Sequence, residues 1–202
     1  MTKKKLGIYG GTFSPPHIGH IRAAESFVKE ISPDELWIIP DFLPPHKQID
    51  NDATAEDRLN MCRLAFSHVE NATVSDIEIK RGGKSYTAIT LTELTSPERD
   101  LYFLCGTDML LTLDTWYDFK TIFRLATICY VRRESDALLT ERIDERVKEY
   151  KEKYGARIIP VKADVIEISS SEMRAKIKNG EPLSDYLTPE VVAYIKEKGL
   201  YN

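Results

Sequence analysis

The sequence predicts an α/β fold in which a doubly wound, mostly parallel sheet is followed by a small helical C-terminal subdomain. Short apolar runs of strand length alternate with segments of helical period, which is typical of a parallel sheet covered on both faces. The 202 residues fit one domain of ordinary size, at roughly 150 residues per domain, and the 42% hydrophobic content can build a sizeable core. We expect one domain over residues 1–202, with residues 168–202 as its C-terminal helical subdomain.

Several apolar runs have the length and the flanking residues of buried strands. Pro40 closes the second run, and Gly82 with Gly83 turns the chain after the third. The expected strands cover residues 5–9, 35–39, 73–79, 101–105, 127–131 and 157–161.

The helices are predicted from apolar spacing and from capping residues. Apolar residues recur at helical spacing from Ile21 to Ile31 and predict the first helix. Thr54 with Asp57 three residues later resembles a capping box, and it opens a second helix that runs through Val69. Further helical segments are expected at 86–94, around 110, and at 119–125, 143–154, 170–178 and 189–198.

The last helix has a signal at each end. Thr188 is an expected N-cap, and Pro189 occupies the first helical position, where its missing N–H costs nothing. Gly199 stands where the helix should end.

Charge and hydropathy exclude several classes of protein. The 28 basic and 32 acidic residues give a formal net charge of −4, whereas a nucleic-acid-binding domain is usually clearly basic, so we expect no nucleic-acid partner. No apolar run approaches the roughly 18 residues of a membrane span, and no signal-type apolar stretch follows the basic residues 3–5. We expect a cytoplasmic protein with no membrane partner.

The cysteines agree with a reducing compartment. Cys62, Cys105 and Cys129 are widely separated, and none belongs to a CxxC pair or a His/Cys cluster. Each lies in an apolar strand run or on an apolar helical stripe, so we expect small core residues and neither a disulfide framework nor a zinc site.

The strongest motif follows the first expected strand and opens the first helix, with the sequence GGTFSPPHIGH over residues 10–20. Gly10 and Gly11 let the backbone approach a bulky ligand, and His17 and His20 lie on one side of a helical turn. Gly19 leaves an opening between them, and the unpaired N–H groups of the helix start suit a phosphate. No lysine follows the glycines, which argues against a P-loop. The alternative is a tight turn with one histidine capping the helix.

A second motif, ISSSEMR, occupies residues 168–174. Ser169, Ser170 and Ser171 place hydroxyls at a helix start with Arg174 one turn in, which makes an anion site. The alternative is a plain serine N-cap followed by a surface arginine.

The two motifs resemble those of the nucleotidyltransferase superfamily. HIGH at residues 17–20 is similar to its HxGH signature, and ISSSEMR is similar to the ISSTxxR motif that binds ATP phosphates. Class I aminoacyl-tRNA synthetases share HIGH, but this chain is too short for a synthetase with a tRNA-binding domain and has no KMSKS stretch. The resemblance implies a Rossmann-like nucleotidyltransferase fold.

From Lys5 to Tyr201 the chain resembles one family of that superfamily, the bacterial nicotinate mononucleotide adenylyltransferases. The resemblance implies that the adenylyl group of ATP is transferred to nicotinate mononucleotide, which gives nicotinate adenine dinucleotide and pyrophosphate in NAD biosynthesis. The motifs that carry it are GGTFSPPHIGH (10–20), PPHK (44–47), Arg58, SYT (85–87), GTD (106–108), WY (116–117), ISSSEMR (168–174) and the closing YL (186–187) and GLY (199–201).

The resemblance also implies roles for individual residues. It makes His17 and His20 catalytic. The residues implied to bind ATP are Gly10, Gly11, Thr12, Phe13, His17, His20, Ser169, Ser170, Ser171 and Arg174. The residues implied to bind nicotinate mononucleotide are Lys47, Ser85, Tyr86, Thr87, Gly106, Asp108, Trp116 and Tyr117.

Several of these roles are physically sensible and have plainer alternatives. An exposed Trp116 gives a flat face for an electron-poor pyridinium, or it is a core residue under a loop. Asp108 can accept from two vicinal ribose hydroxyls, or it caps a helix. Lys47 after a stiff Pro-Pro can reach a phosphate, or it is merely solvated. Thr87 is a ligand of the nicotinate carboxylate or an ordinary helix residue.

Ser14 is a departure, because the family usually has aspartate at this position. If that carboxylate mainly caps the turn, serine can accept from the same backbone N–H. If it contacts substrate or a histidine, binding would change. Ser171 replaces a threonine and keeps the hydroxyl.

The attacking group would be a phosphate monoester whose second pKa is about 6, so no strong base is needed. Mg²⁺ is expected to bridge the ATP phosphates and water, without a dedicated protein metal site. Two alternative functions are a pantetheine-phosphate adenylyltransferase and a nucleotide-binding regulator that has lost catalysis. The sequence leaves open a homo-oligomer and the choice between the acid mononucleotide and its amide.

Overall fold

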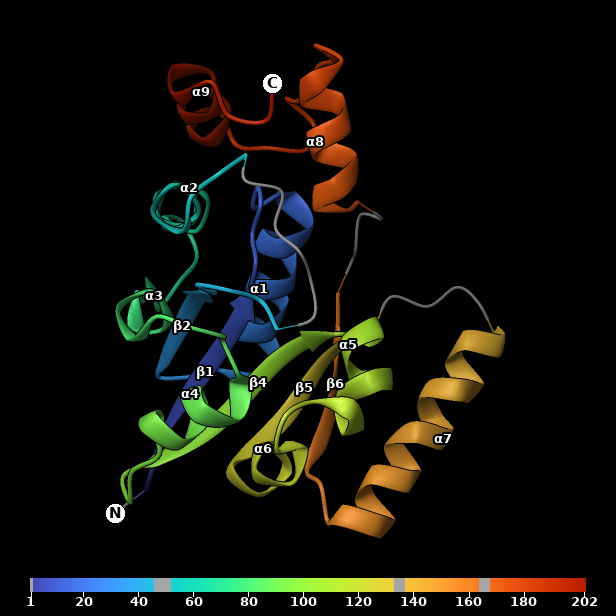
Figure 1. Ribbon diagram of the computed structural model, residues 1–202. Coiled ribbons are helices and arrows are strands. Elements are labelled where there is room, and N and C mark those ends of the chain that lie inside the picture. Colours follow the sequence, from blue (N-terminus) through green and yellow to red (C-terminus); the bar gives the residue numbers. More distant parts are fainter. Residues whose placement is uncertain (1, 46–51, 133–136, 164–167) are drawn as a thin grey trace.

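A computed structural model describes residues 2–45, 52–132, 137–163 and 168–202. Within these residues the strands form one six-stranded sheet in the order β3-β2-β1-β4-β5-β6 (Figure 1). All five strand pairings are parallel. This is the strand order of a doubly wound α/β fold, so the predicted fold class is confirmed.

The sheet order reverses at β1, which pairs with β2 on one side and with β4 on the other. In such a sheet the crevice for ligands lies outside the carboxyl ends of the two strands at the reversal, here β1 and β4. The strands are β1 (Lys4–Gly11), β2 (Glu35–Pro40), β3 (Ala72–Val74), β4 (Arg99–Gly106), β5 (Ala126–Arg132) and β6 (Ile158–Lys162).

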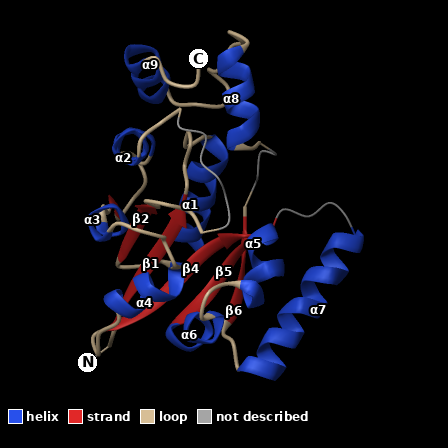
Figure 2. Cartoon of the chain, in the orientation of Figure 1, coloured by secondary structure: helices blue, strands red, loops and turns tan. Residues whose placement is uncertain are grey.

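Helices cover both faces of the sheet (Figure 2). On one face α1, α2, α8 and α9 share a core with strand residues such as Leu36 and Leu104. On the other face α4 to α7 pack on residues such as Phe103 and Ile128. The helices are α1 (Ile18–Ile31), α2 (Ala55–Ala65), α3 (Ile77–Arg81), α4 (Thr87–Leu94), α5 (Thr107–Thr112), α6 (Phe119–Leu125), α7 (Ala137–Tyr154), α8 (Ser170–Lys178) and α9 (Pro189–Lys198), with a 3-10 turn at Leu113–Thr115.

The last two helices lie together beyond α1 and α2 (Figure 1). Met173 of α8 and Val191 of α9 belong to the same buried cluster as α1. Tyr194 of α9 donates to the Asp57 carboxylate of α2 over 3.0 Å. The predicted Thr188 cap and the left-handed Gly199, at φ 60°, are confirmed. The division of residues 168–202 into a subdomain stays a prediction.

The expected strand over residues 73–79 is wrong. Only Ala72–Val74 pairs with β2, and Ile77–Arg81 is the short helix α3, closed by a bond from Lys80 N–H to the Asp76 carbonyl. Alternating apolar residues over so short a run do not distinguish a strand from a helix. The second helix also ends earlier than expected, at Ala65, although its predicted Thr54 capping box is present.

The three cysteines are free and fully buried, as predicted. Burial raises the pKa of the Cys129 thiol to about 12, so it behaves as an apolar core group. Among the described helices, none is both long and apolar enough to cross a membrane.

Candidate active site

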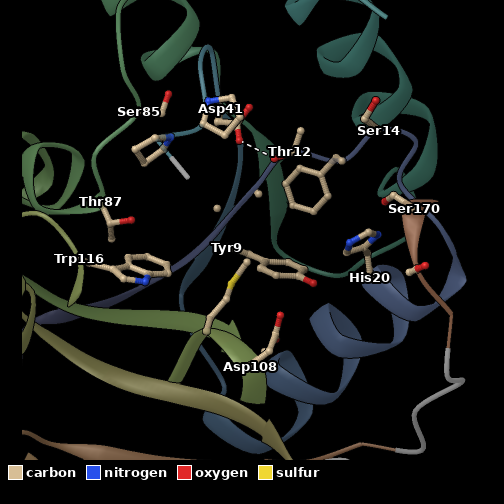
Figure 3. Close-up of a pocket in the computed structure, with 18 of the residues that line it drawn as sticks. Tyr9, Thr12, Ser14, His20, Asp41, Ser85, Thr87, Asp108, Trp116 and Ser170 are labelled. Carbon is tan, nitrogen blue, oxygen red and sulfur yellow. Dashed lines mark hydrogen bonds between the residues drawn. The ribbon is translucent and has the colours of Figure 1, made fainter. Parts of the chain in front are cut away.

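A pocket of about 860 Å³ opens at the carboxyl ends of β1 and β4, where the sheet order reverses (Figure 3). It joins the loops after β1, β2 and β4 to the start of α8. Lys47 and His46 lie outside the described residues. The other residues predicted to bind ATP or nicotinate mononucleotide all line this one pocket: Gly10, Gly11, Thr12, Phe13, His17, His20, Ser85, Tyr86, Thr87, Gly106, Asp108, Trp116, Tyr117, Ser169, Ser170, Ser171 and Arg174.

The two histidine rings lie against each other at the start of α1, tilted by 30° and with ring centroids 3.7 Å apart. His17 is buried and is the N-cap residue, and its backbone N–H donates to Nδ1 of His20 over 3.1 Å. Because a backbone N–H can only donate, Nδ1 of His20 must accept, and the hydrogen of the neutral ring lies on Nε2. His20 therefore caps the helix with one nitrogen and keeps a donor on the other.

The helix start differs from the sequence expectation in two ways. The Ile18 N–H donates to the Tyr186 carbonyl over 2.8 Å, and the His20 N–H to the His17 carbonyl over 2.9 Å, so these groups are not unpaired. A Cβ on Gly19 would lie 3.1 Å from both His17 Nδ1 and Ile168 Cγ2. The missing side chain of Gly19 therefore leaves space for the His17 ring and for Ile168. It does not leave an opening for a ligand.

The serines of the second motif have separate tasks. Ser169 is the N-cap of α8 and accepts from the Glu172 N–H, while Glu172 accepts from Ser169 N–H, which is a plain capping box. Ser170 Oγ donates to the Pro15 carbonyl over 3.0 Å. Arg174 is half-buried, and its guanidinium donates to the Ser14 carbonyl over 3.0 Å and to Ser171 Oγ over 3.2 Å. The serine-arginine turn therefore binds directly to the loop that leads to His17.

Ser14 has a partner that the sequence did not indicate. Its buried hydroxyl lies 3.0 Å from the hydroxyl of Tyr201, near the C-terminus. This contact joins the loop between β1 and α1 to the segment that follows α9.

A buried ion pair between Arg58 and Asp41 lies at the pocket, and no sequence pattern indicated it. Arg58 has a side chain only 1% exposed and contacts the Asp41 carboxylate at 2.8 Å. Arg58 also donates to the carbonyls of Thr12 and Phe42, and Thr12 Oγ1 donates to Asp41 over 2.7 Å. These bonds hold the loops after β1 and β2 together around the buried pair.

Trp116 lies at the end of the pocket away from His20 (Figure 3). Trp116 is half-buried, not exposed as expected, and its ring meets Phe103 edge to face at 6.3 Å. Tyr117 is 55% exposed, and its ring lies against that of Tyr86 at a tilt of 35°, with centroids 4.5 Å apart. Thr87 is the first residue of α4 and lines the pocket.

Asp108 is exposed at the pocket wall, between the two ends (Figure 3). The N-cap of α5 is Gly106, so the alternative that Asp108 caps this helix is wrong. Ser85 is buried and accepts the Phe42 N–H over 2.9 Å, so part of its hydroxyl is committed inside the protein. Glu78, a buried acid beside Ser85, also lines the pocket and was missed, because no motif marks it.

The chain matches known proteins over almost its whole length. The family model described as cytidylyltransferase-like matches residues 8–176. A "Probable nicotinate-nucleotide adenylyltransferase" of Geobacillus kaustophilus is 36% identical over 200 residues, which cover 98% of this chain and 86% of that protein. A protein of the same description from Dehalococcoides mccartyi is 39% identical over 207 residues, covering 100% and 99%. The chain belongs to the nicotinate-nucleotide adenylyltransferase family.

A solved structure has the same fold. The Plasmodium falciparum nicotinic acid mononucleotide adenylyltransferase complexed with NaAD aligns over 98% of this chain and 97% of that chain. The TM-score is 0.75 at 19% sequence identity, so the likeness concerns the fold.

As a member of the nicotinate-nucleotide adenylyltransferase family, the chain is an enzyme that transfers the adenylyl group of ATP to nicotinate mononucleotide in NAD biosynthesis. The pantetheine-phosphate adenylyltransferase and the inactive regulator are therefore set aside.

The acids of the pocket do not form a metal cage. In the described part of the chain no three His, Cys, Asp or Glu side chains are grouped to hold a metal ion. Asp41 is paired with Arg58, and Glu78 accepts from Thr90. This donor set fits a cation whose ligands come chiefly from a triphosphate and water.

Proposed function

We propose that adenylyl transfer takes place in this one pocket, with the ATP triphosphate between the starts of α1 and α8 and the acceptor at the Trp116 end. The observation that carries the proposal is that His20 and Arg174, 154 positions apart in the chain, line the same pocket as Trp116. A nucleotide and a mononucleotide could then lie end to end, with the α-phosphate near the centre.

The chemistry requires positioning and charge stabilisation, and no strong base. A phosphate oxygen of nicotinate mononucleotide forms a bond to the α-phosphorus of ATP, and the bond from that phosphorus to the leaving pyrophosphate breaks. The attacking phosphate is already ionised, since its second pKa is about 6. His20 Nε2–H and His17 would donate to the α-phosphoryl oxygens, while Arg174 and the backbone N–H of Ser170, in the first turn of α8, would hold the leaving pyrophosphate.

The backbone at the start of α1 has a positioning role. Since Nδ1 of His20 is held by the His17 N–H, the ring cannot turn without losing that bond. The Nε2 donor is thus fixed before substrate binds, which is the preorganisation that electrostatic catalysis needs. Gly10, Gly11, Thr12 and Phe13 would line the nucleotide, and Lys47 would contact a phosphate.

At the acceptor end Trp116, whose ring is in edge-to-face contact with Phe103, would stack on the pyridinium. Asp108 would accept from the ribose hydroxyls. The backbone and side chains of Tyr86, Thr87 and Tyr117 would surround the nicotinate carboxylate, with Ser85 and Gly106 shaping the wall.

We propose Mg²⁺ as the divalent cation, held by phosphate oxygens and water, where it would neutralise charge on the leaving pyrophosphate. Three buried free thiols fit a reducing compartment, so we place the reaction in the cytoplasm.

The test is an acceptor comparison with the purified chain, ATP and Mg²⁺. Nicotinate mononucleotide, its amide and phosphopantetheine are each supplied, and dinucleotide and pyrophosphate are measured. We expect equal amounts of nicotinate adenine dinucleotide and pyrophosphate with the acid mononucleotide, and no product with phosphopantetheine. ATP binding without pyrophosphate release would contradict the proposal.

A further inference from the structure

One wall of the pocket at the acceptor end is a single stretch of chain after β4. Residues 107–117 form α5, the 3-10 turn and the two aromatic residues that follow it. The members of this stretch that line the pocket are Asp108, Met109, Thr112, Thr115, Trp116 and Tyr117. Helix α7 packs against α5, and none of its residues that the structure describes lines the pocket. The chemistry above gives α7 no task.

Tyr150 of α7 binds the middle of this wall at both the main chain and the side chain of Asp114. The Asp114 N–H donates to the Tyr150 hydroxyl oxygen over 3.3 Å, and the same hydroxyl donates to Asp114 Oδ1 over 2.9 Å. The Tyr150 side chain is fully buried, and its ring lies against that of Phe123 with centroids 4.9 Å apart. Burial raises the pKa of Tyr150 to about 12, so the hydroxyl keeps the hydrogen that it donates at neutral pH.

Arg146, one turn before Tyr150 on α7, makes a second contact to the same wall. Its Nε donates to the Leu111 carbonyl over 3.3 Å, and its Nη1 lies 3.5 Å from Asp114 Oδ2. Glu149 accepts from the same guanidinium over 2.8 Å. The side chains of Arg146 and Asp114 are 31% and 23% exposed, so we expect their ion pair to contribute less than the bonds of the buried Tyr150.

The position of Asp114 bears on Trp116 because the two residues belong to the same tight turn. Trp116 is the C-cap of the 3-10 turn, and its N–H donates to the Leu113 carbonyl over 3.2 Å. Leu113 is fully buried, and the Trp116 ring meets Phe103 of β4 edge to face. Trp116 is therefore held by β4 at its ring and, through Asp114, by α7 at its backbone.

We propose that Tyr150 is a positioning residue for the mononucleotide acceptor: through its two hydrogen bonds to Asp114 it holds Trp116 where the pyridinium ring stacks. This inference rests on the proposed placement of the acceptor at the Trp116 end. The triphosphate is placed at the starts of α1 and α8, which are other elements. Loss of the Tyr150 hydroxyl should therefore weaken acceptor binding and leave ATP binding unchanged.

The test compares Tyr150→Phe with Tyr154→Phe. Each change removes one hydroxyl from α7 and keeps the ring that packs on Phe123. Tyr154→Phe is the matched control, because the contact to Asp114 is made by Tyr150. Asp114→Ala removes the carboxylate end of the same contact and decides the matter if Tyr150→Phe does not fold. Initial rates give kcat and separate KM values for ATP and for nicotinate mononucleotide.

We expect Tyr150→Phe to raise the KM for nicotinate mononucleotide about fivefold, which is in the range for the loss of one hydrogen bond, with the KM for ATP within about twofold of wild type. Asp114→Ala should repeat the shift, and Tyr154→Phe should change neither KM. An unchanged acceptor KM in folded Tyr150→Phe, equal changes in both KM values, or the same shift in Tyr154→Phe would overturn the inference.

A binding measurement separates this inference from the proposed function. Trp37 and Trp116 are the two tryptophans of the chain, so Trp37→Phe leaves Trp116 as the single fluorescent indole. A pyridinium that stacks on Trp116 should quench its fluorescence, and titration with nicotinate mononucleotide then gives a Kd without turnover. We expect Tyr150→Phe in this background to raise the Kd about fivefold. Quenching with the same Kd in both proteins would overturn the role of Tyr150 alone, whereas no quenching in the Trp37→Phe parent would contradict the proposed place of the acceptor as well.

Discussion

The hydroxyl of Ser14 lies 3.0 Å from the hydroxyl of Tyr201, across 187 residues of chain. Both side chains are buried, and Arg174 donates to the Ser14 carbonyl on the same loop. Burial raises the pKa of Tyr201 to about 12, with the Ser14 hydrogen bond acting in the opposite direction. The end of the chain is thus fastened to the loop that carries His17.

Tyr201→Phe should destabilise the protein by about 1 kcal/mol near neutral pH, because it leaves the buried Ser14 hydroxyl without this bond. The folded-state pKa of Tyr201 is above the ordinary value of 10.0, so wild-type stability falls as pH rises from 10 toward about 12. The phenylalanine variant lacks this fall. Urea unfolding of both proteins at several pH values should show their difference shrinking in alkali; a constant difference would contradict the assignment.

His20→Ala should lower kcat by about 10²–10³, as for the loss of one oxyanion donor, while the fold is kept. The exposed His68 is the matched control, and His68→Ala should turn over like wild type. Steady-state rates together with circular dichroism check both variants. A near-wild-type kcat for His20→Ala would remove this side chain from the mechanism.

Gly19→Ala should impair both packing and turnover. The new methyl group would be 3.1 Å from the His17 ring and from Ile168, so one of them has to move. Overpacking of this kind costs about 1–3 kcal/mol. Thermal unfolding and kcat measure the two effects, and a variant with unchanged Tm and kcat would show that the contact is not tight.

Arg58→Met should destabilise by about 3–5 kcal/mol, because Asp41 would keep a buried charge without its cation. Adding Asp41→Asn should recover part of that loss, since the unpaired charge is then gone. Denaturant unfolding of the two single variants and the double variant tests this. Additive losses would mean that the two side chains are not coupled.

The Glu78 carboxylate should make stability fall as pH rises. Burial raises its pKa above the ordinary 4.5, against the lowering effects of Thr90, Ser85 and Arg81. The folded state then binds the proton more tightly than the unfolded chain, so stabilisation by the protonated form is lost above pH 4.5. We expect the free energy of unfolding of the wild type, measured relative to that of Glu78→Gln, to fall from acid toward neutral pH. A difference between the two proteins that stays constant or grows with pH would contradict the raised pKa of Glu78.

The sequence was sufficient to predict an element where the signals for it lie close together in the chain. The bounds of α8, Ser170–Lys178, agree with prediction because Ser169 and Glu172 form a capping box at its start and Gly180 follows its end. The two nucleotide motifs could be placed at one pocket because parallel strands bring their carboxyl ends to the same edge of the sheet.

The sequence was not sufficient to predict buried charged residues whose bonding partners are distant in the chain. Asp41 and Glu78 belong to no motif, and their burial is explained by Arg58 and Thr90, which bond to them in the folded chain. The strand expected at 73–79 failed for a related reason. Its alternating residues fit either element, and the burial of Glu78 on a helix could not be foreseen from the pattern.

The most direct test of the account is a crystal structure of the chain with a non-hydrolysable ATP analogue. The account predicts one triphosphate within hydrogen-bond distance, about 2.7–3.2 Å, of both the His20 imidazole and the Arg174 guanidinium. A triphosphate that touches only one of them, or that binds outside the pocket, would contradict it.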